Sequence, residues 1–262
     1  MRTPRFRTLQ LGMSVFCSLV GSIGCAAKTA EIQDGASPGY IVLLPGVEGG
    51  VWQLRGVREG LRDAGIDWTI EIIPWGTPPL HSLSNLTDLP ENLRRADRIA
   101  ARLTELRREA PKGPLVLIGY SGGGGLALLT LNALTPEIKV DRVVLVAAAI
   151  SNSYDLTVAK GHCTDRIINI YSPRDGIVGW GTSWLGTIDR VKTVSAGHSG
   201  FVEPDGTLRE DPMLKQVQWC AEWEKYGHSG GHVCYLYRAW ARHVLAPLVN
   251  PDVPADRIAA GR

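Results

Sequence analysis

The sequence carries almost no excess of charge of either sign. Its 28 Lys and Arg residues nearly balance 26 Asp and Glu residues, which leaves a formal net charge of +2 over 262 residues. Binding to nucleic acid or to an anionic membrane surface relies on a clear cationic excess. We therefore expect no nucleic-acid partner, and no membrane contact driven by charge. Internal repeats and low-complexity tracts are also missing, so one globular domain is expected.

Several motifs that announce cofactors are absent from the sequence. There is no G-x-x-x-x-G-K-[ST] segment, no C-x-x-C pair and no H-E-x-x-H segment. Without the first motif the chain has no P-loop to bind nucleotide phosphates. Without the other two it lacks the commonest ligand spacings of structural and catalytic zinc sites. We expect neither a metal site nor a cofactor.

Apolar runs long enough to cross a membrane are also lacking. Residues 9–23 are mostly apolar and uncharged, follow Arg2, Arg5 and Arg7, and precede small residues. This run is too short for a spanning helix and has no stop-transfer pattern after it, so residues 1–25 are predicted to be a secretory signal peptide. The mature protein is then exported: periplasmic, secreted, or held at the outer membrane.

Cysteine is scarce, and one cysteine, Cys25, lies at the end of the predicted signal peptide, where it could be lipidated. The segment Ser22-Ile23-Gly24-Cys25 resembles a bacterial lipobox, although Ser22 stands where leucine is usual. Lipidation of Cys25 with membrane attachment, and simple secretion, both stay open. Export permits one disulfide among Cys163, Cys220 and Cys234, with the pairing undetermined and one thiol left over.

The stretch from 114 to 130, PLVLIGYSGGGGLALLT, is the most informative part of the chain. Leu115 to Ile118 is an unbroken apolar run, typical of a strand buried on both faces, and Leu126 to Leu134 is typical of a buried helix. The turn between them matches G-x-S-x-G. A serine on such a sharp turn adopts a strained backbone, and glycine at 119 and 123 removes side chains that would collide.

In this strand–turn–helix setting the motif resembles the nucleophile elbow of the α/β hydrolases. The resemblance implies an α/β fold for residues 40–250, with a mostly parallel sheet of about six strands, helices on both faces and no large cap domain. Residues 26–39 are predicted to be a linker and residues 251–262 a C-terminal tail. Strands are expected at 40–44, 68–73, 115–118, 140–146, 167–171 and 214–219, and helices at 52–64, 91–110, 126–134 and from 233 onward.

A rival interpretation of the same glycines is a dinucleotide-binding loop. Gly122, Gly124 and Ala127 fit G-x-G-x-x-A, a pattern that requires an acidic residue at the C-terminal end of the next strand. That strand is expected at 140–146, where the only acid, Asp141, stands at the opposite end. The hydrolase interpretation is therefore preferred.

The resemblance implies an oxyanion hole made of two backbone N–H groups. Gly122, which follows the serine, would supply one group. The loop after the first strand, Pro45-Gly46-Val47-Glu48-Gly49-Gly50, would supply the other, from Val47 or, as a second choice, Glu48. Such donors stabilise the negative charge that develops on a carbonyl oxygen under attack.

The same resemblance assigns a triad acid just past the strand at 167–171. Asp175 occupies that place, in Ser172-Pro173-Arg174-Asp175-Gly176-Ile177-Val178. A carboxylate there would hold the catalytic histidine in one tautomer and stabilise its charged form. The competing interpretation is an ordinary Asp-Gly turn.

The order Ser, Asp, His then requires a histidine after residue 175. His198 has small neighbours and a suitable spacing from Asp175. His232 lies in a glycine-rich loop between the last expected strand and the last expected helix, which is where the family places its histidine. His232 is preferred and His198 is kept as the alternative; His228 would be a loop neighbour.

These residues predict a serine hydrolase that cleaves a small-molecule or lipid carboxylic ester, as an esterase or a lipase does. A thioesterase or acyltransferase could use the same triad. A non-catalytic binding protein at the cell surface could keep the scaffold alone. The substrate and the oligomeric state are not determined by the sequence.

Overall fold

A computed structural model describes residues 30–76 and 82–253 of the chain. Within these ranges the chain forms a seven-stranded sheet in the order β1-β3-β2-β4-β5-β6-β7, in which only β1 runs antiparallel to its neighbour. The strands are β1 (Glu31–Gln33), β2 (Tyr40–Leu44), β3 (Thr69–Ile72), β4 (Leu115–Tyr120), β5 (Val140–Val146), β6 (Cys163–Tyr171) and β7 (Leu214–Gln218). The predicted signal peptide with Cys25 lies outside the described residues, as do residues 254–262 of the predicted tail.

The mostly parallel sheet confirms the predicted fold class, with one strand more than expected. The additional strand is β1, within the segment 26–39 that was predicted to be a linker, so that prediction is wrong for residues 31–33. β1 pairs with β3, and its Glu31 forms ion pairs with Arg55 and Arg58. A strand of three residues with a half-exposed Ile32 has no hydrophobic pattern, so nothing in its sequence marks it.

β4 shows why the sheet needs a helical layer on each face. All six of its residues are buried. Leu115 and Leu117 belong to one apolar cluster, whereas Val116, Ile118 and Tyr120 belong to the other. Alternate side chains of a strand point to opposite faces, so an unbroken apolar run is what a strand covered on both sides requires.

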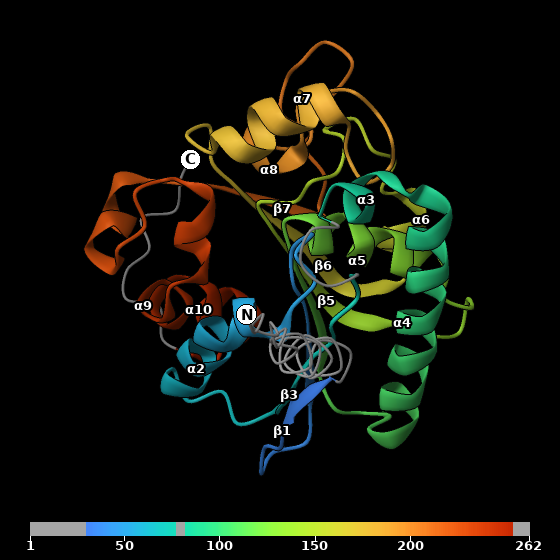
Figure 1. Cartoon of the computed structure of the whole chain (residues 1–262). Coiled ribbons are helices and arrows are strands. Elements are labelled where there is room, and N and C mark those ends of the chain that lie inside the picture. The colour runs from blue at the N-terminus through green and yellow to red at the C-terminus, as the bar shows by residue number, and fades with distance from the viewer. Residues whose placement is uncertain (1–29, 77–81, 254–262) are drawn as a thin grey trace, which may run out of the picture.

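The helices divide between these two faces (Figure 1). One layer consists of α4 (Leu89–Glu109), α5 (Gly122–Asn132) and α6 (Thr157–Gly161), which pack Ile99, Leu103 and Leu126 against the sheet. The other layer buries Leu61, Trp223 and Trp240. It is built from η1 (Val51–Leu54), α2 (Arg55–Asp63), η3 (Ala221–Tyr226), η4 (His232–Leu236), α9 (Arg238–Trp240), η5 (Ala241–Leu245) and α10 (Ala246–Val249).

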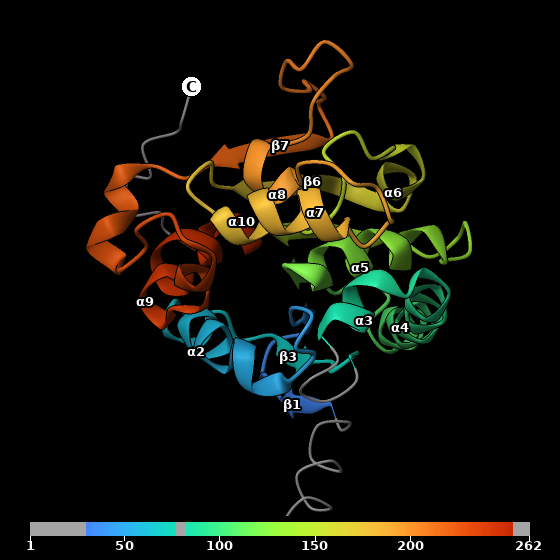
Figure 2. The same cartoon turned by 45° about the horizontal axis from the view of Figure 1, so that its top comes forward.

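Short helices follow the C-terminal ends of the strands. The connection from β6 to β7 carries η2 (Ile177–Gly181), α7 (Thr182–Leu185) and α8 (Ala196–Ser199), which lie above the sheet in Figure 1 and come toward the viewer in Figure 2. The connection from β5 to β6 contains only α6. No large cap domain is present among the described residues, in agreement with the predicted fold class.

Two expected helix boundaries differ from the structure. No helix was expected between the strand at 68–73 and the helix at 91–110, but the structure has α3 (Ser82–Thr87) there. The next helix, α4, begins at Leu89, with Asp88 accepting a hydrogen bond from the Glu91 N–H. The expected final helix from 233 is broken into η4, α9, η5 and α10. Tyr237 has an extended backbone between η4 and α9, which separates the histidine-bearing turn from the helical segment behind it.

Cys163, Cys220 and Cys234 are all free, so the permitted disulfide is not formed. Burial raises the pKa of Cys163 and of Cys220 to about 11, which keeps both side chains as neutral thiols near pH 7. None of the helices in the described part of the chain has the length and apolar character needed to cross a bilayer.

Candidate active site

Ser121 lies on the turn between β4 and α5, in a backbone conformation that few non-glycine residues adopt. Its φ is 54° and its ψ is −121°. The Ser121 N–H donates to the carbonyl of Val146 (2.9 Å), and the Ser121 carbonyl accepts from the N–H groups of Gly124 and Ala149 (2.9 Å each). These bonds hold the strained turn in place from two sides.

The glycines of the G-x-S-x-G segment stand where no side chain fits. A Cβ atom at Gly119 would lie 2.3 Å from the carbonyl oxygen of Gly123. A Cβ atom at Gly123 would lie 2.3 Å from the carbonyl oxygens of Leu44 and Pro45. Both contacts are with backbone atoms, which cannot move aside, so the turn requires glycine at these two positions.

Ser121, His232 and Asp175 form one hydrogen-bonded line. The Nε2 atom of His232 lies 2.9 Å from Ser121 Oγ, and its Nδ1 atom lies 2.6 Å from Asp175 Oδ2. An ionised carboxylate can only accept hydrogen bonds, so Nδ1 carries the proton and Nε2 is left to accept from the serine hydroxyl. Asp175 is fully buried, and Ser121 and His232 are 7% and 9% exposed.

The second oxygen of Asp175 is also satisfied. Asp175 Oδ1 accepts hydrogen bonds from the backbone N–H groups of Ile177 (3.1 Å) and Val178 (3.3 Å), at the start of η2. A buried carboxylate with bonds on both oxygens keeps one orientation toward its histidine.

His198, the alternative from the sequence, has a different contact. Its Nδ1 lies 3.0 Å from the backbone carbonyl oxygen of Asp175, not from the carboxylate. The structure therefore brings His232, and not His198, within hydrogen-bond distance of both Ser121 and Asp175. His232, the preferred candidate from the sequence, is thus the histidine that lies between the serine and the carboxylate.

The two predicted oxyanion-hole residues face each other beside the serine. A Cβ atom at Gly122 would lie 3.3 Å from the backbone N of Val47, so the loop after β2 runs directly alongside the start of α5. Among the described residues no acceptor is bonded to the N–H of either Val47 or Gly122. Two free donors next to a serine hydroxyl are what an oxyanion requires.

Tyr120, the variable residue of the motif, connects the elbow to the histidine. Its hydroxyl donates to the carbonyl oxygen of His232 (3.2 Å), and the two rings lie 5.0 Å apart. Burial, with the nearby Asp175 carboxylate, raises the pKa of Tyr120 well above its usual value, so the hydroxyl keeps its proton.

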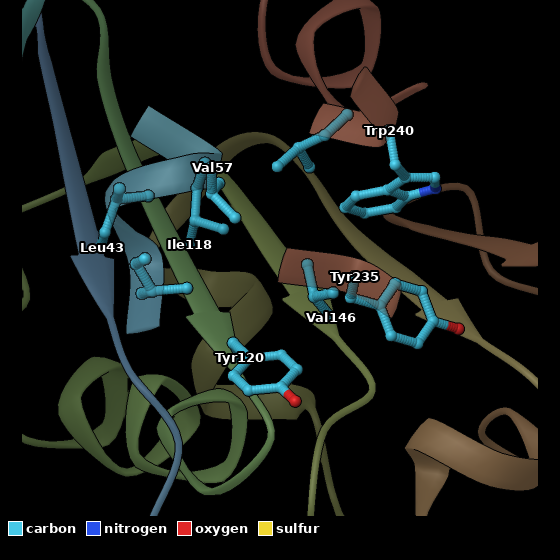
Figure 3. Close-up of a pocket in the computed structure, with 9 residues that line it drawn as sticks. Leu43, Val57, Ile118, Tyr120, Val146, Tyr235 and Trp240 are labelled. Atoms are coloured by element: carbon cyan, nitrogen blue, oxygen red, sulfur yellow. The ribbon is translucent and has the colours of Figure 1, made fainter. Parts of the chain in front are cut away.

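Tyr120 also lines a cavity of about 10 Å³ (Figure 3). Aliphatic side chains from β2, β4, β5 and α2 line it together with Tyr235 and Trp240 from the helical layer. Pockets that bind small molecules are roughly 300–1,000 Å³ in volume. This cavity is therefore a packing gap between the sheet and the helices and not a substrate site.

His228 anchors the loop that carries His232. Its Nδ1 accepts from the Gly230 N–H (3.1 Å), and its carbonyl accepts from the indole N–H of Trp219 (2.9 Å). The ring is fully buried, with its centroid 4.1 Å from that of Tyr235 and 5.5 Å from that of Trp240. Burial lowers the pKa of His228 to about 4, against the opposing effects of a backbone hydrogen bond and the Asp175 carboxylate.

The rival dinucleotide interpretation has no support in the structure. Asp141 lies near the start of β5, and its carboxylate is bonded to Arg107, Thr164 and the Leu115 N–H. A Cβ atom at Gly124 would lie 2.6 Å from the Cβ of Ala148, so that glycine serves helix packing. No group of three or more metal-ligating side chains occurs among residues 30–76 and 82–253.

Comparison with known proteins gives structural matches only. No protein-family model matches the chain, and no curated protein does. Lipase B from Aspergillus fumigatus is 14% identical, with a TM-score of 0.54 over 88% of this chain and 60% of the lipase. A sugar hydrolase from Lactococcus lactis is 14% identical, with a TM-score of 0.50 over 86% of this chain and 92% of that one.

At such identities the likeness concerns the fold. This chain therefore has the α/β-hydrolase fold, which confirms the fold that the elbow motif predicted.

Several residues that contact the site had no predicted role. Tyr120 was part of the motif but had no assigned role, and His228 was described only as a loop neighbour. Trp75 and Asn85 lie between the strand expected at 68–73 and the helix expected at 91–110. Their side chains donate hydrogen bonds to the Pro45 and Val47 carbonyls of the loop after β2, and no sequence pattern indicates these bonds. Hydrogen bonds between side chains and distant backbone carbonyls follow no spacing rule.

The buried His228 predicts a loss of stability in acid. Between about pH 6.5 and pH 4 the unfolded chain binds a proton at His228 that the folded chain does not, so the free energy of unfolding falls as the pH falls, by up to about 3 kcal/mol. The variant His228→Asn keeps an acceptor for the Gly230 N–H but has no such proton. Urea unfolding at several pH values should show a shallower decline for the variant; identical declines would contradict the prediction.

Proposed function

We propose that this protein is a serine hydrolase that cleaves carboxylic esters, with Ser121 as nucleophile, His232 as general base and Asp175 as the carboxylate that orients the histidine. The observation that carries the proposal is the hydrogen-bonded line from the Ser121 hydroxyl through His232 to Asp175. Three such groups in this geometry form the arrangement that activates a serine hydroxyl.

In the first half of the reaction, Ser121 Oγ attacks the ester carbonyl carbon while its proton passes to His232 Nε2. The carbonyl oxygen becomes an oxyanion next to the N–H groups of Gly122 and Val47. When the tetrahedral intermediate collapses, the carbon–oxygen bond to the alcohol breaks, and His232 returns the proton to the departing alcohol. The product is an acyl group on Ser121.

In the second half, a water molecule takes the place of the alcohol. His232 accepts a proton from this water as the oxygen attacks the acyl carbon, and the proton then goes to Ser121 Oγ as the acid leaves. Asp175 keeps Nδ1 protonated throughout and stabilises the imidazolium form. The similarity to a structure named as a lipase supports an ester as substrate. A thioester would react by the same steps.

The first test is the variant Ser121→Ala. Without the hydroxyl no acyl-enzyme forms, so p-nitrophenyl butyrate hydrolysis should fall at least about 10³-fold, and labelling by a fluorophosphonate probe should disappear. Ser37→Ala is the matched control, because Ser37 is exposed in the loop before β2, at the opposite end of the strands. Absence of turnover and labelling in the unaltered protein would instead support a binding protein that keeps the scaffold alone.

The second test separates the two histidines. His232→Gln should lower kcat at least about 10³-fold, because Ser121 loses its base. His198→Gln should keep most of the activity, since the His198 ring bonds the backbone carbonyl of Asp175 and not its carboxylate. Steady-state kinetics at equal concentrations of folded protein decide between them; a greater loss at residue 198 would refute the assignment.

We also propose that the chain is exported through residues 1–25 and that Cys25 carries a lipid. In a bacterial host the full chain should then lose its N-terminal segment and sediment with membranes, whereas Cys25→Ser should release it. An unshortened chain in the cytoplasm would contradict export, and membrane attachment unaffected by the substitution would contradict lipidation.

A further inference from the structure

The loop after β2, residues 45–49, is held by hydrogen bonds at almost every peptide group. The Pro45 carbonyl accepts from the indole N–H of Trp75 (2.6 Å), and the Gly46 N–H donates to Gln53 Oε1 (3.0 Å). These two groups belong to the same peptide unit. That unit is therefore held from opposite sides, because the carbonyl and the N–H of a trans peptide point in opposite directions.

The next peptide unit is held on one side only. The Gly46 carbonyl accepts from the Gly49 N–H (2.7 Å), which directs the Val47 N–H of the same unit the opposite way. That N–H is one of the two free donors beside Ser121. The loop is close to the serine here, because a Cβ atom at Gly46 would lie 3.3 Å from the Cβ of Ser121.

The peptide unit after Val47 is held by Asn85. The side-chain amide of Asn85, in α3, donates to the Val47 carbonyl (2.7 Å). Asn85 is fully buried, and its amide reaches the Val47 carbonyl because two glycines leave room for it. A Cβ atom at Gly76 would lie 2.6 Å from Asn85 Nδ2, and a Cβ atom at Gly49 would lie 2.6 Å from Gly76. Val47 is thus fixed by hydrogen bonds on the peptide units before and after it.

Asn85 is itself supported from α4. The Asn92 side-chain amide donates to the Asn85 carbonyl (2.9 Å), and Arg95 donates to Asn92 Oδ1 (2.8 Å). The Arg95 guanidinium lies 5.5 Å from the ring centre of Trp75, the residue that holds the Pro45 carbonyl. All four side chains are buried. A buried polar network of this kind is rigid, so it can hold the loop in one conformation.

We infer that Asn85 is a positioning residue for the oxyanion hole: its bond to the Val47 carbonyl, together with the Trp75 bond to Pro45, aims the Val47 N–H at the developing oxyanion. The inference rests on the proposed function. Donors stabilise a transition state best when their orientation is set before the reaction begins. Asn85 bonds none of the three triad side chains among the described residues, and it acts on the site through the Val47 carbonyl.

The test is the variant Asn85→Ala, assayed on p-nitrophenyl butyrate with active sites counted by fluorophosphonate labelling. Without its anchor, the Val47 N–H is no longer held toward the oxyanion, so kcat per active site should fall about tenfold to a hundredfold while KM stays nearly constant. The inhibition constant of a trifluoromethyl ketone, which forms a tetrahedral oxyanion on the serine, should rise by a similar factor.

Asn169→Ala is the matched control. Asn169 is also fully buried and also donates its amide to a backbone carbonyl, that of Ala196 (3.0 Å), but it lies in β6 and does not contact the loop after β2. This variant should lose stability without change in kcat per active site or in the inhibition constant. A merely structural role for Asn85 would make both variants behave alike, which would overturn the inference.

Other outcomes are equally decisive. Asn85→Ala with kcat/KM per active site within about twofold of the unaltered protein would overturn the inference and leave the proposed function intact. If the unaltered protein neither turns over the ester nor reacts with the probe, the proposed function itself fails. Should Asn85→Ala not fold, Trp75→Phe, which keeps an aromatic ring but removes the bond to Pro45, tests the same point with the same criteria.

Discussion

The backbone of Ser121 is the constraint on which the site depends. A non-glycine residue in its conformation costs roughly 1–3 kcal/mol, and it persists only where the surroundings determine it several times over. Here the Val146 carbonyl on β5 accepts from the serine N–H, and the Ala149 N–H just past β5 donates to the serine carbonyl. Glycines at 119 and 123 allow the strand and the helix to approach. Hydrogen bonds to β5 and to the residue just past it thus hold the strained turn in its conformation. The turn places the serine hydroxyl at the C-terminal end of β4.

The direction of the strands explains why the other groups meet at this hydroxyl. In a parallel sheet the C-terminal ends of neighbouring strands lie at one edge. The loops after β2, β6 and β7 therefore bring Val47, Asp175 and His232 to the same place from positions far apart in the sequence. In the sheet β2 lies on one side of β4, and β6 and β7 lie on the other. The loop with Val47 therefore approaches the serine from one side, and the loops with Asp175 and His232 approach it from the other.

Buried polar contacts tie both sides of the site to the helical layers. On the oxyanion side, Asn85 and Trp75 connect the loop after β2 to α3 and α4. On the histidine side, Tyr120 bonds the His232 carbonyl, and His228 fixes the turn before it. Arg174, next to the acid, stacks over Trp219, with its Cζ atom 4.1 Å from the ring centre. This contact joins the loop that carries Asp175 to the loop that carries His232. An apolar side chain in the place of one of these polar groups would fill the same space but would not orient the loop by a hydrogen bond.

Local pattern was enough to predict most strands and the elbow. The apolar run of β4 and the glycines around Ser121 each have a physical reason that lies within a few residues. β1 escaped prediction because three residues paired at a sheet edge show no periodicity. The final helix was predicted as one piece because apolar residues at helical spacing continue through 237, where the backbone is extended in the structure.

The sequence by itself determined the fold class and the strained turn, because both follow from the spacing of apolar residues and glycines along the chain. It left His198 and His232 as alternatives and did not reveal Asn85 or Tyr120. Only the tertiary structure decided which imidazole lies between the serine and the carboxylate. That choice depends on how loops from separate strands pack against one another, and hydrogen bonds across such distances leave no pattern in the order of the residues.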